Sequence, residues 1–170
     1  KIKNRSRLFY QMANIEASRF KGKNNWAILL GIDGFITEGT GDNVFFVRDG
    51  KVFTPEARDI LVGISRNYIF ELCQQLNIEC IEKNLETYDA YTADESFMTA
   101  TPFCLLPVCR FNGLKIGDGK MGEITKSLHD QWSENVGLDI FQQIREYSAE
   151  CKNLNKDRPT PYVFSSNDEE

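Results

Sequence analysis

The Asp49-Gly50 dipeptide constrains the fold more than any other feature of this sequence. It stands between two short apolar runs, residues 44–48 and 51–54. A tight β-hairpin turn needs positive φ angles at its central residues, which Gly and Asp adopt at low cost. Asn112-Gly113 repeats the signal farther along the chain. We therefore expect antiparallel strand pairs in the fold.

Helical and strand patterns alternate irregularly around these hairpins. Apolar residues spaced three and four apart predict helices, and short apolar runs between turn residues predict strands. Hairpins without a regular β-α-β alternation favour an α+β fold with a mixed or antiparallel sheet. The predicted helices are residues 8–20, 65–76, 85–90 and 122–147, the last interrupted near Gly137. The predicted strands are residues 26–32, 35–37, 44–48, 51–54, 78–81, 95–101, 105–111 and 114–116.

Size and charge narrow the classes of protein that fit. A chain of 170 residues has room for one domain with a hydrophobic core. Its net charge of -5 argues against a nucleic-acid partner, and no apolar run approaches the roughly 18 residues of a membrane span. Residues 151–170 are polar with an acidic end, so we expect a flexible tail after a domain that covers residues 1–150.

The cysteine and histidine content bears on location and metal binding. Five cysteines without regular spacing are typical of reduced thiols, which predicts a cytoplasmic protein. His129 is the single histidine, so a His-rich metal site is not expected and no metal is predicted.

Four segments carry candidate chemistry, and each also has an ordinary interpretation. Residues 1–7 are a basic cluster, a pattern that most often forms a solvated face. Residues 37–43 form a Gly-rich link that a plain turn would also explain. Gly63-Ile64-Ser65 opens a predicted helix, where free N–H groups and a hydroxyl either bind an anion or cap the helix. Residues 99–102, Thr-Ala-Thr-Pro, end a strand with hydroxyls suited to a phosphate edge.

Taken in order, these segments resemble the class IV, or fold type IV, pyridoxal-phosphate aminotransferases, the branched-chain and D-amino-acid aminotransferase family. The resemblance extends from Lys3 to about Phe141. Its most specific parts are residues 38–45, Glu-Gly-Thr-Gly-Asp-Asn-Val-Phe, and residues 61–66, Leu-Val-Gly-Ile-Ser-Arg. It implies the large domain of a D-amino-acid aminotransferase-like fold, a mixed or antiparallel pseudo-barrel with packed helices, with the N-terminal small domain absent.

The resemblance also implies roles around pyridoxal 5'-phosphate. Lys3 matches the Schiff-base lysine that shuttles a proton, with Lys1 as the rival position. Glu38 matches the carboxylate that pairs with the pyridine nitrogen, and Asn43 is expected to brace the turn that aims it. Arg7 lies near the position of a residue over the phenolic oxygen of the cofactor.

The phosphate and the substrate have implied partners as well. Ile64 and Ser65 match the helix-start residues that bind the phosphate, and Thr101 matches a later phosphate-binding threonine. Ala100 and Thr101 are also placed beside the substrate. Pro102 departs from the family, since it has no N–H to offer a substrate carboxylate.

The implied function is transfer of an amino group between an amino acid and a 2-oxo acid by a homodimer. Two alternatives remain open at this point. One is 4-amino-4-deoxychorismate lyase, which shares the fold and the cofactor. The other is a truncated, non-catalytic domain that serves as an assembly partner.

Overall fold

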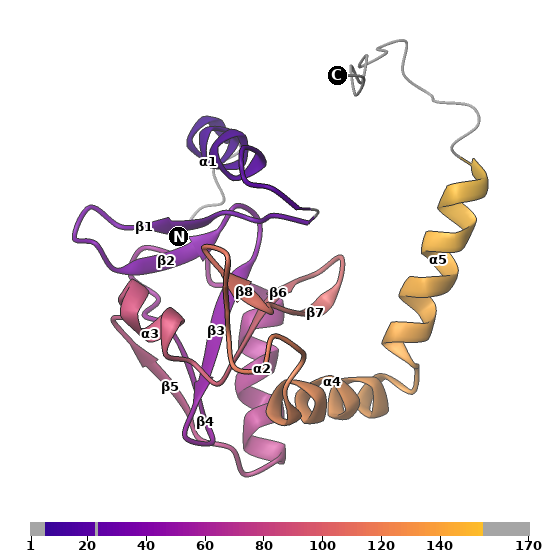
Figure 1. Ribbon diagram of the computed structural model, residues 1–170. Helices are drawn as coiled ribbons and strands as arrows, with labels where there is room; N and C mark the ends of the chain where they lie inside the picture. The colour runs from indigo at the N-terminus through magenta and orange to yellow at the C-terminus, as the bar shows by residue number, and fades with distance from the viewer. Residues whose placement is uncertain (1–5, 23, 155–170) are drawn as a thin grey trace.

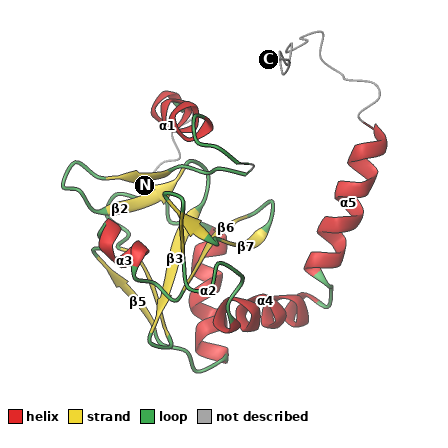
Figure 2. Ribbon diagram, viewed as in Figure 1, coloured by secondary structure: helices red, strands yellow, loops and turns green. Residues whose placement is uncertain are grey.

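A five-stranded mixed sheet forms the centre of the molecule, in the order β5-β4-β3-β6-β7. The computed structural model describes residues 6–22 and 24–154. Strands β4 and β5 are parallel, and the other neighbours in the sheet are antiparallel. Two further strand pairs, β1-β2 and β8-β9, lie outside this sheet, and helices α2 and α4 lie side by side next to it (Figures 1 and 2).

The elements have the following bounds. The helices are α1 Leu8–Ser18, α2 Ile64–Gln75, α3 Thr87–Tyr91, α4 Glu123–Val136 and α5 Ile140–Leu154. The strands are β1 Ile28–Leu30, β2 Ile36–Gly39, β3 Asn43–Arg48, β4 Lys51–Pro55, β5 Cys80–Lys83, β6 Glu95–Ala100, β7 Cys104–Pro107, β8 Arg110–Phe111 and β9 Leu114–Lys115.

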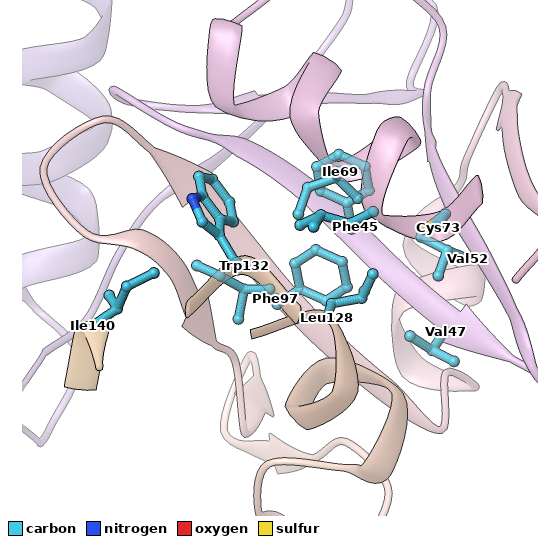
Figure 3. Close-up of a cluster of buried hydrophobic side chains, with 11 residues drawn as sticks. Phe45, Val47, Val52, Ile69, Cys73, Phe97, Leu128, Trp132 and Ile140 are labelled. Carbon is cyan, nitrogen blue, oxygen red and sulfur yellow. The ribbon is translucent and has the colours of Figure 1, made fainter. Parts of the chain in front are cut away.

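Strand β3 is central because it buries both of its faces. Alternate side chains of a strand point to opposite sides, so Phe45 and Val47 pack on one side of the sheet while Val44 and Phe46 pack on the other. Phe45 stacks on Phe97, its direct partner on β6, with ring centroids 4.9 Å apart. Figure 3 shows this pair among the side chains that α2 and α4 contribute to the core.

Both predicted hairpin turns are confirmed. Asp49 and Gly50 have φ angles of 50° and 75°, and Asn112 and Gly113 have 46° and 83°. Positive values at both central residues are what a tight hairpin requires. The two dipeptides therefore join the antiparallel pairs β3-β4 and β8-β9, as predicted.

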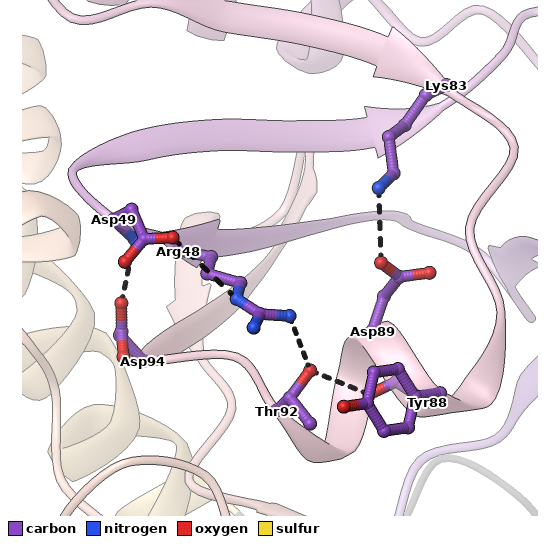
Figure 4. A network of polar contacts seen from close by, with 7 residues as sticks. All are labelled: Arg48, Asp49, Lys83, Tyr88, Asp89, Thr92 and Asp94. Carbon is purple, nitrogen blue, oxygen red and sulfur yellow. Dashed lines mark hydrogen bonds and ion pairs between the residues drawn. The ribbon is translucent and has the colours of Figure 1, made fainter.

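A network of polar contacts fastens the short helix α3 to the sheet (Figure 4). Asp89 accepts a hydrogen bond from the Glu86 backbone N–H at 2.8 Å and pairs with Lys83 at 3.1 Å. At the other end of the helix, Arg48 donates to the Thr92 hydroxyl at 3.0 Å. The sheet edge and the hairpin end are thereby joined through one five-residue helix.

Two sequence expectations about strands need correction. The α+β class is confirmed, but the described strands form an open sheet with β5 and β7 as edges, and no closed barrel is found among them. The strand expected at residues 105–111 is divided into β7 and β8. The division follows Val108, whose N–H makes the last ladder bond to Ser96 before the chain turns away to pair with β9.

The C-terminal helical region divides where the sequence indicated. Gly137 adopts a left-handed conformation, with φ 67°, and ends α4. Helix α5 then runs away from the body of the molecule (Figure 1) and continues to Leu154, so it includes the first residues of the expected tail. The rest of that predicted tail lies outside the described residues.

Candidate active site

Glu38 lies at the end of β2, just before a tight turn that leads into β3. The turn closes with a hydrogen bond of 3.0 Å from the Gly39 N–H to the Asp42 carbonyl. A Cβ at position 39 would overlap the Asp42 Oδ1, so the Asp42 carboxylate would have to move to admit any other residue. The Gly-rich spacing thus places Glu38 and Asn43 on either side of one tight turn.

The Glu38 carboxylate is buried and held on both oxygens. Its Oε2 accepts the Leu61 backbone N–H at 2.8 Å, and the Asn43 side-chain amide lies at the long limit of 3.5 Å from the same oxygen. Its Oε1 accepts the Tyr10 hydroxyl at 2.6 Å. A buried carboxylate needs such donors, because burial without them would be costly.

Asn43 joins this carboxylate to the start of α2. Its amide donates to the Leu61 carbonyl at 2.9 Å. A Cβ added to Gly63 would lie 2.5 Å from the Asn43 Oδ1, so the backbone before α2 approaches this side chain closely. Asn43 also faces Thr99 of β6 in the ladder. Three distant segments therefore meet around one side chain.

The predicted phosphate residues flank this meeting point. Ile64 is the first residue of α2, with an exposed side chain, and Ser65 follows it with a buried one. Because the N–H groups of a first helical turn have no helical partner, this end suits an anion. Ala100 ends β6, and Thr101 is exposed on the next turn, two residues past Thr99.

Arg7 is exposed and contacts the turn that follows Glu38. Its guanidinium donates to the Thr40 carbonyl and lies over the Tyr10 ring, with Cζ 5.3 Å from the ring centroid. A Cβ on Gly41 would come within 3.3 Å of the same guanidinium. Arg7 is therefore brought to the Glu38 turn. Lys3, and its rival Lys1, lie outside the described residues.

Asp42 is a second buried acid in the turn that follows Glu38, and its pKa is raised. Burial raises the pKa of Asp42 to about 6, the Glu38 carboxylate adds to the rise, and the Gly41 backbone partly offsets it. Among the described residues, neither carboxylate oxygen of Asp42 has a partner with full hydrogen-bond geometry, so the Gly41 backbone compensates its burial only in part. A buried and poorly partnered carboxylate favours its neutral form, so this turn disfavours a charge on Asp42.

Sequence reasoning missed Tyr10 and the Leu61 backbone N–H as partners of Glu38. Tyr10 is three residues after Arg7, so both lie on one face of α1. That spacing could have drawn attention to Tyr10, whereas a backbone donor such as Leu61 leaves no mark in the sequence.

Within residues 6–22 and 24–154, no group of three or more His, Cys, Asp or Glu side chains is placed to hold a metal ion. Over the same part of the chain, no helix has the length and apolar character needed to cross a membrane.

Comparison with known proteins gives this arrangement a family. The sequence model described as Amino-transferase class IV matches residues 1–111. The chain therefore belongs to the class IV aminotransferase family, as the sequence resemblance indicated.

Named relatives and solved structures agree with this assignment. The chain is 38% identical over 121 residues to a putative branched-chain-amino-acid aminotransferase of Methanocaldococcus jannaschii, which covers 69% of this chain and 42% of the relative. It is similar to the branched-chain amino acid aminotransferase from Escherichia coli, with a TM-score of 0.67, 36% identity and coverage of 72% and 41%. The branched-chain amino acid aminotransferase from Thermobaculum terrenum in its PLP-form gives a TM-score of 0.70 and 33% identity, with coverage of 75% and 41%. The chain thus spans less than half the length of each of these relatives.

Proposed function

We propose that this protein transfers an amino group between an amino acid and a 2-oxo acid with the aid of pyridoxal 5'-phosphate. The observation that carries the proposal is the buried Glu38 carboxylate, held by donors from α1 and from the segment before α2. Family membership supports the reaction class. Solved relatives in the PLP-form or with pyridoxamine 5'-phosphate support the cofactor.

The residues present suit the chemical groups of this cofactor. A pyridine nitrogen needs a carboxylate partner, and Glu38 is a buried one with acceptor capacity left on Oε1. A phosphate needs a helix start with free N–H groups, and α2 begins at Ile64, after Gly63, with no side-chain cap hydrogen bond at its first turn. Thr101 at the end of β6 is exposed and offers a hydroxyl.

The cofactor, when bound, supplies a ring that draws electrons from the substrate carbon next to the amino group. Glu38 keeps a proton on the pyridine nitrogen. The Ile64 and Ser65 backbone N–H groups and the hydroxyls of Ser65 and Thr101 bind the phosphate. Lys3 holds the cofactor in its resting position and then moves a proton to and from the substrate carbon.

Arg7 and Pro102 distinguish the substrate side of this site. Arg7 is held at the Glu38 turn by its bond to the Thr40 carbonyl, which supports its proposed position near the phenolic oxygen of the cofactor. Pro102 offers no N–H beside Ala100 and Thr101, so the substrate carboxylate must find another donor there. We infer a carboxylate contact in this protein that differs from one made by a backbone N–H at position 102.

Three features of the intact protein belong to the same proposal. A preceding small domain completes the substrate pocket, which agrees with coverage of 42% of the M. jannaschii relative. The protein is a homodimer, and the exposed apolar side chains of Leu8, Met12 and Ile15 on α1 offer surface for assembly. The protein acts in the cytoplasm, which fits the free thiols of Cys73 and Cys109.

An assay that measures both products tests the activity directly. The purified protein, loaded with the cofactor, is given an amino acid and a 2-oxo acid, and both products are measured by chromatography. Formation of the new amino acid and the new 2-oxo acid in equal amounts supports the proposal. Release of pyruvate from aminodeoxychorismate without any amino acceptor, or no product from either assay, contradicts it.

A further inference from the structure

The Glu38 carboxylate shares one of its oxygens with a tyrosine. Its Oε2 accepts the Leu61 N–H at 2.8 Å and the more distant Asn43 amide at 3.5 Å. Its Oε1 accepts the Tyr10 hydroxyl at 2.6 Å. Because a carboxylate has about four acceptor sites, one site of Oε1 remains that no donor among the described residues fills.

We propose that Tyr10 is a positioning residue for Glu38, whose hydroxyl fills one acceptor site of Oε1 and leaves the other as the only direction from which the cofactor ring nitrogen can bind. This inference rests on the proposed function. It adds a residue that makes no contact with the reacting atoms and acts through the carboxylate.

The Tyr10 ring is itself held in place. The Arg7 guanidinium covers the ring at 5.3 Å and is fixed to the Thr40 carbonyl. The Phe9 ring lies beside it, with centroids 4.0 Å apart. These contacts fix the orientation of the phenol, which reaches Glu38 from α1 although the two residues are 28 positions apart in the sequence.

The phenol also keeps its proton, so the contact lasts over the working range of pH. Burial raises the pKa of Tyr10 to about 12, the Glu38 hydrogen bond and charge add to the rise, and Arg7 opposes it. The described groups that act on this pair are Arg7 on one side and Asp42 on the other. Tyr10 is thus a permanent donor to an acceptor-only partner.

The role of the pair can be measured as the pH dependence of cofactor binding. Cofactor absorbance is followed from neutral to acidic pH for wild type, Tyr10→Phe and the control Tyr88→Phe, which removes the same oxygen from an exposed tyrosine. Loss of one donor makes a carboxylate easier to protonate, so the acid midpoint of binding rises by about one pH unit in Tyr10→Phe. It does not move in Tyr88→Phe.

A second measurement needs no cofactor. With ¹³C at the tyrosine Cζ, nuclear magnetic resonance follows Tyr10 in wild type and in Glu38→Gln, with Tyr10→Phe used for assignment. Loss of the neighbouring charge lowers the pH at which Tyr10 begins to lose its proton. An unchanged onset means that the two side chains are not paired, which overturns the inference whatever the reaction is.

The two failures are distinguishable. Wild type that binds no cofactor at any pH contradicts the proposed function and removes the partner that Tyr10 is meant to serve. Wild type that binds cofactor, with Tyr10→Phe behaving like Tyr88→Phe or binding more tightly, overturns the role of Tyr10 alone.

Discussion

At the scale of single residues, the turn between β2 and β3 separates two acids that are four positions apart. Glu38 has donors on both oxygens, whereas Asp42 has no well-placed donor among the described residues and its carboxylate packs against Gly39. The first is therefore the acid that we propose as the partner of a pyridine nitrogen, and the second costs stability whenever it ionises.

Replacement of Glu38 tests the electron-accepting role of the ring. Glu38→Gln removes the charge and keeps the shape, so we expect amino transfer to slow by about 100-fold or more, while cofactor is still taken up. Stopped-flow absorbance during a single turnover measures the proton-transfer step. A variant with an unchanged single-turnover rate would show that Glu38 does not serve the ring nitrogen.

Replacement of Asp42 tests the cost of the second acid. The pKa of Asp42 is raised in the folded protein to about 6, so the folded state holds this proton more tightly than the unfolded chain does. Its contribution to stability is full at low pH and is lost as pH rises through about 6. As the pH rises from mildly acidic to mildly alkaline, the free energy of unfolding of wild type should therefore fall by about 2 kcal/mol relative to that of Asp42→Asn, whose side chain stays neutral.

Urea unfolding at several pH values measures this difference. The control is Asp118→Asn, which changes an exposed aspartate and should follow wild type at every pH. A difference between Asp42→Asn and wild type that does not vary with pH would be inconsistent with a raised pKa at Asp42.

At the scale of elements, features that neighbouring residues cause could be predicted from the sequence, whereas features that distant contacts cause could not. The β3-β4 hairpin could be predicted because Asp49-Gly50 contains its whole cause within two residues. The start of α4 was predicted to within one residue, but its cap was not, since Gly122 brings no capping side chain of its own. The cap comes from Glu95 of β6, whose oxygens accept the Ile124 N–H at 3.0 Å and the Thr125 N–H at 2.7 Å.

The cap of α4 gives a stability prediction. Glu95→Ala leaves two helix N–H groups without acceptors and should lower the free energy of unfolding by about 1–2 kcal/mol. Glu95→Gln keeps an acceptor and should lose less. Chemical unfolding measures both against Glu71→Ala, which truncates an exposed glutamate on α2. Equal stability of Glu95→Ala and Glu71→Ala would refute the capping role.

The residues of the candidate site divide in the same way, into those that a local motif identifies and those that only a distant contact reveals. Glu38, Asn43, Ile64 and Ser65 could be named from the sequence because each belongs to a short motif that is ordered along the chain. Tyr10 could not, because its contact with Glu38 depends on how α1 lies over the β2-β3 turn. The resemblance implied a pseudo-barrel, whereas the described strands form an open sheet, because strand patterns do not determine whether the edges of a sheet meet.

At the scale of the whole molecule, this chain supplies only part of the length of its relatives, about two fifths of the M. jannaschii protein. Ile64, at the helix start proposed for the phosphate, has an exposed side chain, and so do the apolar residues of α1. Surfaces of this kind are covered by a further domain or a second subunit in an assembled enzyme.

Assembly gives a prediction at this scale. Met12→Glu places a charge among the exposed apolar side chains of α1, so it should weaken the proposed dimer by at least about tenfold in its dissociation constant. Sedimentation velocity over a range of concentrations measures the change, with Asp118→Asn as the control. A wild-type protein that sediments as a monomer at every concentration would argue against a dimer altogether.

The central claim is that Lys3 and Glu38 bind the same cofactor molecule. The direct measurement is borohydride reduction of the cofactor-loaded protein, followed by peptide mapping with mass spectrometry. The account predicts a phosphopyridoxyl group on Lys3, at a similar yield in wild type and in Glu38→Gln, and no label in Lys3→Ala. A label on Lys1 or another lysine in wild type, or none on a protein that demonstrably binds the cofactor, would contradict it.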